Sequence, residues 1–159
     1  MSVTVNIKGL DKLQKGLLSL PTKVARKVLG DALRKGAYLL RDATQAKTPV
    51  KTGALRDSIK VKSKKLSEVE YQSIVAPFLS GGANPVWYAH LVEFGGRYVI
   101  KAKGGDKDKR ARVVATGRIG AQPFMRPAFD STRGEIIRTI SEKLADGVAR
   151  EFKKLGTNG

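Results

Sequence analysis

The sequence predicts an α+β domain in which an antiparallel sheet of about four or five strands packs against two long helices on one face. Helical periodicity covers residues 22–47 and recurs near the carboxyl end, with apolar side chains on one stripe of each segment. Between them, short stretches alternate apolar and polar residues, as strands with one buried face do. Helix, strands and helix follow in runs, which argues against a βαβ topology.

The amino-terminal third predicts a strand and two helices. A period-two stretch ending at Gly9 predicts a strand with one buried face, formed by Val3, Val5 and Ile7. Leucines at spacings of three and four then predict a short helix that starts near Leu10. Pro21 favours a restart, and the first long helix runs from Thr22 to about Lys47. Two glycines inside it indicate that another backbone approaches closely there: Gly30 and Gly36.

The middle of the chain predicts a hairpin and a short central helix. Residues 49–58 form a turn, after which residues 59–64 and 69–75 alternate as two antiparallel strands. In the aromatic segment 87–96, three apolar residues share one face of one or two helical turns: Tyr88, Leu91 and Val92. Gly95 and Gly96 would end these turns with positive φ before a strand begins at Arg97.

The last third predicts a second hairpin and a second long helix. Residues 97–101 and 112–116 are its two strands, and we expect a mobile basic loop over about 101–112. The last helix should run from about Pro127 or Thr132 to Lys154, and residues 156–159 should form a cap and a frayed end. No linker or internal repeat divides the chain, so we expect one domain over residues 1–159.

Composition excludes several classes of site. The chain has no cysteine and one histidine, which excludes disulfides, thiolate metal sites and a multi-histidine metal site within one chain. No apolar run is long enough to span a bilayer, and no secretory signal is evident at the amino terminus. Lysine and arginine number 31 against 14 carboxylates, and the resulting charge of +17 favours contact with something acidic.

No set of residues predicts catalysis, a metal site or a cofactor. His90 and Glu93 are three apart and would share a helix face, but no nucleophile pattern accompanies them. We interpret His90 as a packing or surface residue, and Glu93 as the partner of an arginine or the cap of a turn. Gly104–Lys107 lacks the spacing of a phosphate-binding loop.

The basic residues are candidates for contact with a partner protein or DNA, although a merely solvated surface would look the same. They lie on one predicted strand and around the second hairpin: Lys60, Lys62, Lys64, Lys101, Lys103, Lys107, Lys109, Arg110 and Arg112. No helix-turn-helix, zinc finger or aromatic RNA-binding strand accompanies them, so sequence-specific reading is not predicted. One functional alternative is therefore a non-specific nucleic-acid-binding protein of a mobile element. Another is assembly through the apolar side chains of Phe124, Met125 and Phe129; otherwise Phe124 and Phe129 fill the core where the last helix starts.

Three segments together resemble a known family. They are Pro49–Ile59, Tyr88–Gly95 and Gln122–Ala128, and they follow an amino-terminal Gly-Leu-x-x-Leu that begins at Gly9. In this order they resemble the gene-product-ten-like tail-component family of long-tailed, double-stranded DNA bacteriophages. The similarity runs from about Gly9 to Phe129. Beyond Phe129, the last helix resembles the family only in being a long amphipathic helix, without a matching motif.

The resemblance implies a structural protein of the virion without enzymatic activity, metal or cofactor. Such proteins complete the tail or join it to the filled head, as a sixfold ring around the DNA channel at the neck. The implied partners are further copies of the chain, a head-closure or connector protein, a tail-terminator or tail-tube protein, and genomic DNA through non-specific contact, with no membrane. The implied location is the virion neck at the top of the tail, reached from the host cytoplasm during assembly.

The residues that match the family motifs are expected to be structural. They are Thr52, Gly53, Leu55, Arg56, Tyr88, Glu93, Phe94, Gly95, Pro123, Phe124 and Pro127. We expect Gly53 to permit the turn after the first long helix, and Leu55 to anchor it. We also expect Arg56 to pair with Glu93, because Glu93 is the only carboxylate in the aromatic segment.

Overall fold

The computed structural model describes residues 10–67, 70–78, 88–101 and 113–157. The elements in this part of the chain are α1 (Leu10–Leu18), α2 (Thr22–Lys47), α3 (Ala54–Ser58), β1 (Ile59–Lys65), β2 (Tyr71–Pro77), α4 (Ala89–Phe94), β3 (Gly96–Lys101), β4 (Val113–Ile119) and α5 (Met125–Thr157). The strand expected over residues 3–7 lies outside the described residues. The α+β class is confirmed, whereas the sheet that we expected is not.

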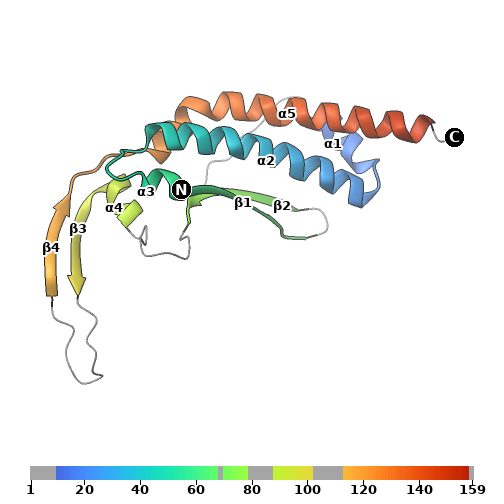
Figure 1. Cartoon of the computed structure of the whole chain (residues 1–159). Helices are drawn as coiled ribbons and strands as arrows, with labels where there is room; N and C mark the ends of the chain where they lie inside the picture. The colour runs from blue at the N-terminus through green and yellow to red at the C-terminus, as the bar shows by residue number, and fades with distance from the viewer. Residues whose placement is uncertain (1–9, 68–69, 79–87, 102–112, 158–159) are drawn as a thin grey trace, which may run out of the picture.

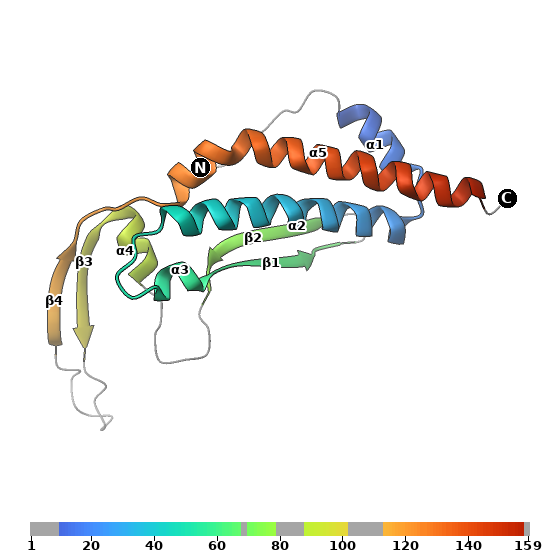
Figure 2. The same cartoon turned by 45° about the horizontal axis from the view of Figure 1, so that its top comes forward.

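Helix α2 is the middle layer of the molecule. It lies between α5 and the β1–β2 hairpin, and α5 runs antiparallel to it (Figures 1 and 2). The expectation that both long helices cover one face of a sheet is therefore wrong. α2 buries two sides: Ala32 belongs to a cluster shared with α5, whereas Gly30 lies under the Tyr71 ring of β2. A helix with a second buried side can separate two layers.

Small residues let α2 and α5 pack closely. A Cβ atom on Gly36 would lie 2.7 Å from the side chain of Ile140, and one on Gly147 would lie 2.5 Å from Val28. The core cluster beside them consists of Leu20, Val28, Ala32, Leu144 and Val148. The glycines of α2 thus admit side chains, and not the second backbone that we expected.

The strands form two separate antiparallel pairs, β1–β2 and β3–β4. The first pair runs from Ile59 opposite Pro77 to Lys65 opposite Tyr71. The expectation of one sheet of four or five strands is wrong for the described part of the chain. At the start of β3, Gly95 and Gly96 have φ values of 73° and 151°, and the β3–β4 pair runs away from the helices (Figure 1). Positive φ at these glycines is as predicted.

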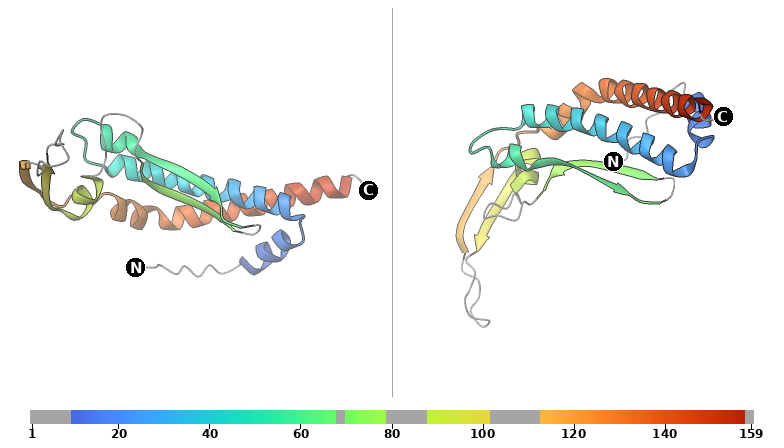
Figure 3. Two further views of the ribbon diagram at one scale, coloured as in Figure 1. Left: turned by 90° about the horizontal axis from the view of Figure 1, so that it is seen from below. Right: turned by 45° about the vertical axis from the view of Figure 1, so that its right-hand side comes forward.

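The β3–β4 pair, called here the arm, projects from the end of the body that holds α3 and α4 (Figures 1 and 3). Its register places Tyr98 opposite Gly117, and a Cβ atom on Gly117 would lie 2.5 Å from the Tyr98 ring. The aromatic ring therefore covers the glycine across the two strands. The loop expected over about 101–112 lies, beyond Lys101, outside the described residues.

Candidate functional site

The three segments that carry the resemblance meet in one apolar cluster. Leu55, Ile59 and Phe124 are its buried members, and both Ile59 and Phe124 have 0% of their surface exposed. Tyr88 and Val92 of the α4 region pack against them. Residues almost 70 positions apart thus share one core, which fixes α3, α4 and the start of α5 relative to one another. Phe124 belongs to this core, which agrees with one of our two interpretations of that residue.

Glu93 joins α4 to α5 by capping the helix. Its Oε2 atom accepts the backbone N–H of Phe124 at 2.7 Å and that of Met125 at 2.9 Å, and its Oε1 accepts that of Arg126 at 3.1 Å. Only 7% of Glu93 is exposed. The first N–H groups of a helix have no partner within it, and they carry a partial positive charge, so a buried carboxylate is a strong cap.

The cap explains where α5 begins. After the three capped N–H groups comes Pro127, which has none, and the N–H of Ala128 already donates to the carbonyl of Phe124 at 3.2 Å. Every backbone donor of the first turn is therefore satisfied or absent. The helix starts at Met125, earlier than the expected Pro127 or Thr132, because the carboxylate comes from α4 and not from a local side chain. At its other end α5 continues to Thr157, past the expected end at Lys154.

The pKa of Glu93 lies below its ordinary value. Burial of the carboxyl works to raise this pKa, but the bonds from the N–H groups of Met125, Phe124 and Arg126 lower it, as does the positive charge of Arg126. The net shift favours the ionised carboxylate. The capping group is therefore charged at neutral pH.

Arg56 does not supply the partner that we expected for Glu93. Its Nε donates to Asp57 at 3.0 Å on the surface, so the predicted Arg56–Glu93 pair is wrong. Nearby, Gly53 takes the left-handed conformation at φ 80° and permits the turn after α2, as predicted; it is also the N-cap of α3, which was not predicted. Thr52 accepts a long bond of 3.5 Å from the N–H of Ala54.

Sequence reasoning missed two features of this junction. The five residues of α3 are too few for a periodic pattern, so they were expected as a turn. Gln45 of α2 also went unnoticed, although its amide donates to the carbonyl of Ile59 at 3.0 Å and to that of Arg56 at 3.3 Å. A glutamine near the end of a long amphipathic helix gives no distinctive signal.

Phe94 is an exposed aromatic side chain on the outer side of the junction. Its side chain is 70% exposed, although the segment around it is largely apolar. Two hollows of about 600 Å³ adjoin it, one lined also by Phe129 and exposed His90, and the other by Pro123 and Pro127. Large exposed aromatic residues beside hollows are typical of contact surfaces.

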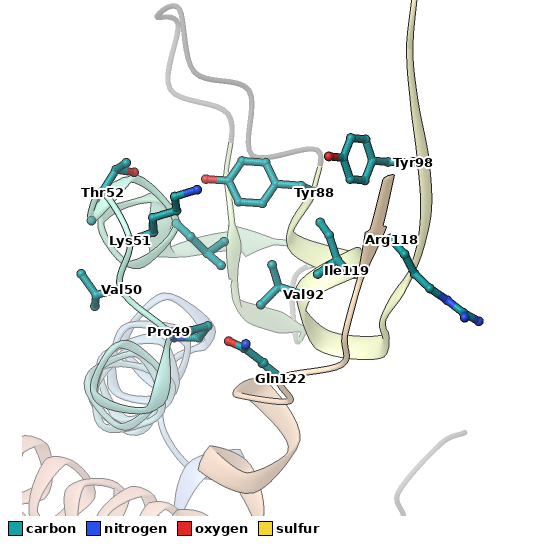
Figure 4. Close-up of a pocket in the computed structure, with 12 residues that line it drawn as sticks. Pro49, Val50, Lys51, Thr52, Tyr88, Val92, Tyr98, Arg118, Ile119 and Gln122 are labelled. Carbon is teal, nitrogen blue, oxygen red and sulfur yellow. The ribbon is translucent and has the colours of Figure 1, made fainter. Parts of the chain in front are cut away.

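A groove of about 620 Å³ lies on another side of the junction, at the base of the arm (Figure 4). One wall is the loop from Pro49 to Gly53, and the other includes Tyr98 and Ile119 of the arm. Figure 4 shows the Lys51 side chain directed toward the Tyr88 ring, whereas Arg118 points away from the groove. The lining is mixed, and it contains no carboxylate among the described residues.

The structure describes only some of the basic candidates. Lys60, Lys62 and Lys64 are exposed on β1. Lys101 ends β3, and its side chain is not among those described. The remaining candidates lie outside the described residues: Lys103, Lys107, Lys109, Arg110 and Arg112.

Neither a metal cluster nor a membrane span is found in the described ranges. No group of three His, Cys, Asp or Glu residues there is placed to hold a metal ion. No helix in the same ranges has the length and apolar character needed to cross a bilayer.

The described features are a capped helical junction, a projecting arm and exposed apolar residues, which together define a domain that presents surfaces to neighbours. The chain belongs to the family described as "Bacteriophage HK97-gp10, putative tail-component", whose model matches residues 11–95. It is thus a structural tail component of a bacteriophage and a protein of the virion. The match is shorter than the expected similarity from Gly9 to Phe129, and it leaves out Gln122–Ala128. No curated protein and no solved structure matches the chain.

Proposed function

We propose that the chain is a ring-forming protein of the phage neck, which completes the tail or joins it to the DNA-filled head. The ring is sixfold and surrounds the DNA channel. Its neighbours are a head-closure or connector protein on one side and a tail-terminator or tail-tube protein on the other. Its role is structural, without catalysis. Membership of a tail-component family supports this proposal at the level of the virion.

The arm is the observation that carries the proposal. An isolated two-stranded ribbon is at best marginally stable in water, because it has two unpaired edges and buries little apolar surface. In the described part of the chain no third strand pairs with β3 or β4, and the arm points away from the helices. A neighbouring subunit that covers the arm would satisfy its edges and bury Val99, which is 53% exposed.

The charge of the chain gives a reason for ordered assembly. Copies that carry +17 each repel one another in solution, so ring closure needs a docking partner to offset the repulsion. Size-exclusion chromatography with light scattering on the purified chain should therefore give a monomer or small oligomer at physiological salt. A stable ring without partners would contradict this part of the proposal.

Shortening the arm tests the proposal. Residues 99–116 are replaced by Asn-Gly, which joins the opposed residues Tyr98 and Gly117 by a two-residue turn. The variant should keep the thermal midpoint of the wild type, because the helices and the capped junction are untouched. In complementation of a phage that lacks the gene, it should leave filled heads and tails unjoined.

The matched control removes residues 156–159 at the carboxyl end, where we propose no contact with a neighbour. This variant should restore joined particles. Normal titres from the arm-shortened variant would refute a joining role for the arm, and a variant that fails to fold would refute the independence of the arm from the body.

A further inference from the structure

The outer face of the β1–β2 hairpin carries a row of lysines. Ile59, Val61 and Ser63 alternate with these lysines along β1 and face α2, so the side chains of Lys60, Lys62 and Lys64 point outward and are exposed. Seen from below, the hairpin lies over α2, with this face toward the viewer (Figure 3, left). The lysines therefore form one row on an accessible surface.

No opposite charge balances this row within the two strands. Neither β1 nor β2 contains an aspartate or glutamate. The residues directly across from the three lysines are uncharged: Ala76, Ile74 and Gln72. The ammonium group of Lys62 lies 4.0 Å from the centre of the Phe78 ring, which helps to hold this charge at the surface.

We infer that this lysine face binds the sugar-phosphate backbone of duplex DNA without sequence preference. Alternate residues of a strand are about 6.6 Å apart, so the row presents evenly spaced positive charges to a regular array of phosphates. Lysine acts as a point charge for phosphate and does not require the fixed geometry of a bidentate contact. The two strands place no arginine, asparagine or helix on this face, and Gln72, across from Lys64, is the side chain there that could bond to a base edge, so affinity with little specificity is expected.

The composition of the face favours DNA over an acidic protein. The core of a protein interface is apolar and depleted of charge, especially of lysine. Here three lysines lie along one of the two strands of the face, and the apolar side chains beside them include Ala76, Ile74 and Phe78. The face also borders the concave side of the molecule between the hairpin and the arm (Figure 1). The biological setting of this inference rests on the proposed neck function, but its test uses the purified chain alone.

The test compares two variants of equal charge. In one, Lys60, Lys62 and Lys64 are replaced by glutamine; in the other, three exposed lysines of α5 are replaced by glutamine: Lys143, Lys153 and Lys154. Circular dichroism and thermal melting first establish that both fold. Fluorescence anisotropy then measures the affinity for a labelled duplex of arbitrary sequence at salt concentrations from about 50 to 200 mM.

The hairpin variant should lose at least about tenfold in affinity at 100 mM salt, and its slope of log K against log salt should fall by about 3. The α5 variant should keep most of the wild-type affinity and most of the wild-type salt slope. Equal losses in the two variants would overturn the inference, because they would show that only net charge matters. A hairpin variant that binds DNA normally yet fails to join particles would also overturn it; the face would then contact an acidic protein, and the neck role would stand. If the hairpin variant binds DNA poorly but still joins particles, the inference stands, and DNA binding by this face is not required for joining.

Discussion

The carboxylate of Glu93 accepts the backbone N–H of Phe124 at 2.7 Å, and through this bond α4 holds the first turn of the longest helix of the protein. Phe124 in turn has no exposed surface and packs with Leu55 and Ile59. A polar cap and an apolar anchor therefore act at the same position. The base of the arm is fixed there as well, because the N–H of Gln122 donates to the carbonyl of Val92 at 2.7 Å.

Replacement of Glu93 by alanine should lower the free energy of unfolding by about 2–3 kcal/mol, because it leaves N–H groups at a buried helix start without an acceptor. Urea denaturation measures the change. Glu135→Ala, on an exposed position of the same helix, is the control and should change it by less than about 0.5 kcal/mol. Equal effects of the two substitutions would refute the capping role of Glu93.

The contribution of Glu93 should depend on pH. Because its pKa is lower in the folded protein than in the unfolded chain, its contribution is complete above the unfolded value of about 4.3 and is lost as pH falls through the folded value. The free-energy difference between wild type and Glu93→Gln should therefore be largest near neutral pH and shrink below about pH 4. Urea titrations at several pH values measure this difference. A difference that stays constant from pH 7 to pH 3 would contradict the ionised cap.

Two glycine-to-alanine substitutions should change the free energy of unfolding in opposite directions. Gly53→Ala forces a Cβ atom into the left-handed conformation at φ 80° and should cost about 1–2 kcal/mol. Gly134 lies inside α5, where a Cβ atom would meet no neighbouring element within 4 Å among the described residues, so Gly134→Ala should stabilise the protein by about 0.5–1 kcal/mol. Both are read from the same denaturation experiment. A stabilised Gly53→Ala variant would show that the turn does not require the left-handed conformation.

Phe94 should matter for assembly and not for stability. Since the side chain is 70% exposed, Phe94→Ser should change the free energy of unfolding by less than about 1 kcal/mol. In complementation it should reduce the yield of joined particles. Phe152→Ser, which alters another exposed phenylalanine near the far end of α5, should not. Full titres from Phe94→Ser would show that this side chain does not contact a neighbouring protein in the particle.

Much of the local structure could be predicted because the sequence encodes it locally. The apolar stripe predicted α2, Pro21 and Pro49 predicted its bounds, and the glycine pair at Gly95 and Gly96 marked the end of α4. Alternation predicted the first hairpin, and two short runs rich in β-branched and aromatic residues predicted the second. It did not give their arrangement, since a period of two says which side chains share a face and nothing about which strands pair across the fold.

The candidate site was predicted in its parts but not in its connections. A carboxylate in an apolar segment needs a partner, and a helix that starts beside prolines without a local cap needs an acceptor; together these two observations point to Glu93 and α5. Only the fold brings them together, across 31 residues of sequence. The prediction of Arg56 as the partner failed because Asp57, its neighbour in sequence, pairs with it at the surface.

Cryo-electron microscopy of the neck of an intact particle would test the central claim most directly. Our account predicts a ring of this chain between head and tail, with the arm of each copy against a neighbouring subunit and the lysine face of β1 toward the DNA. Absence of the chain from the particle, or its presence only at the distal end of the tail, would contradict the proposed function.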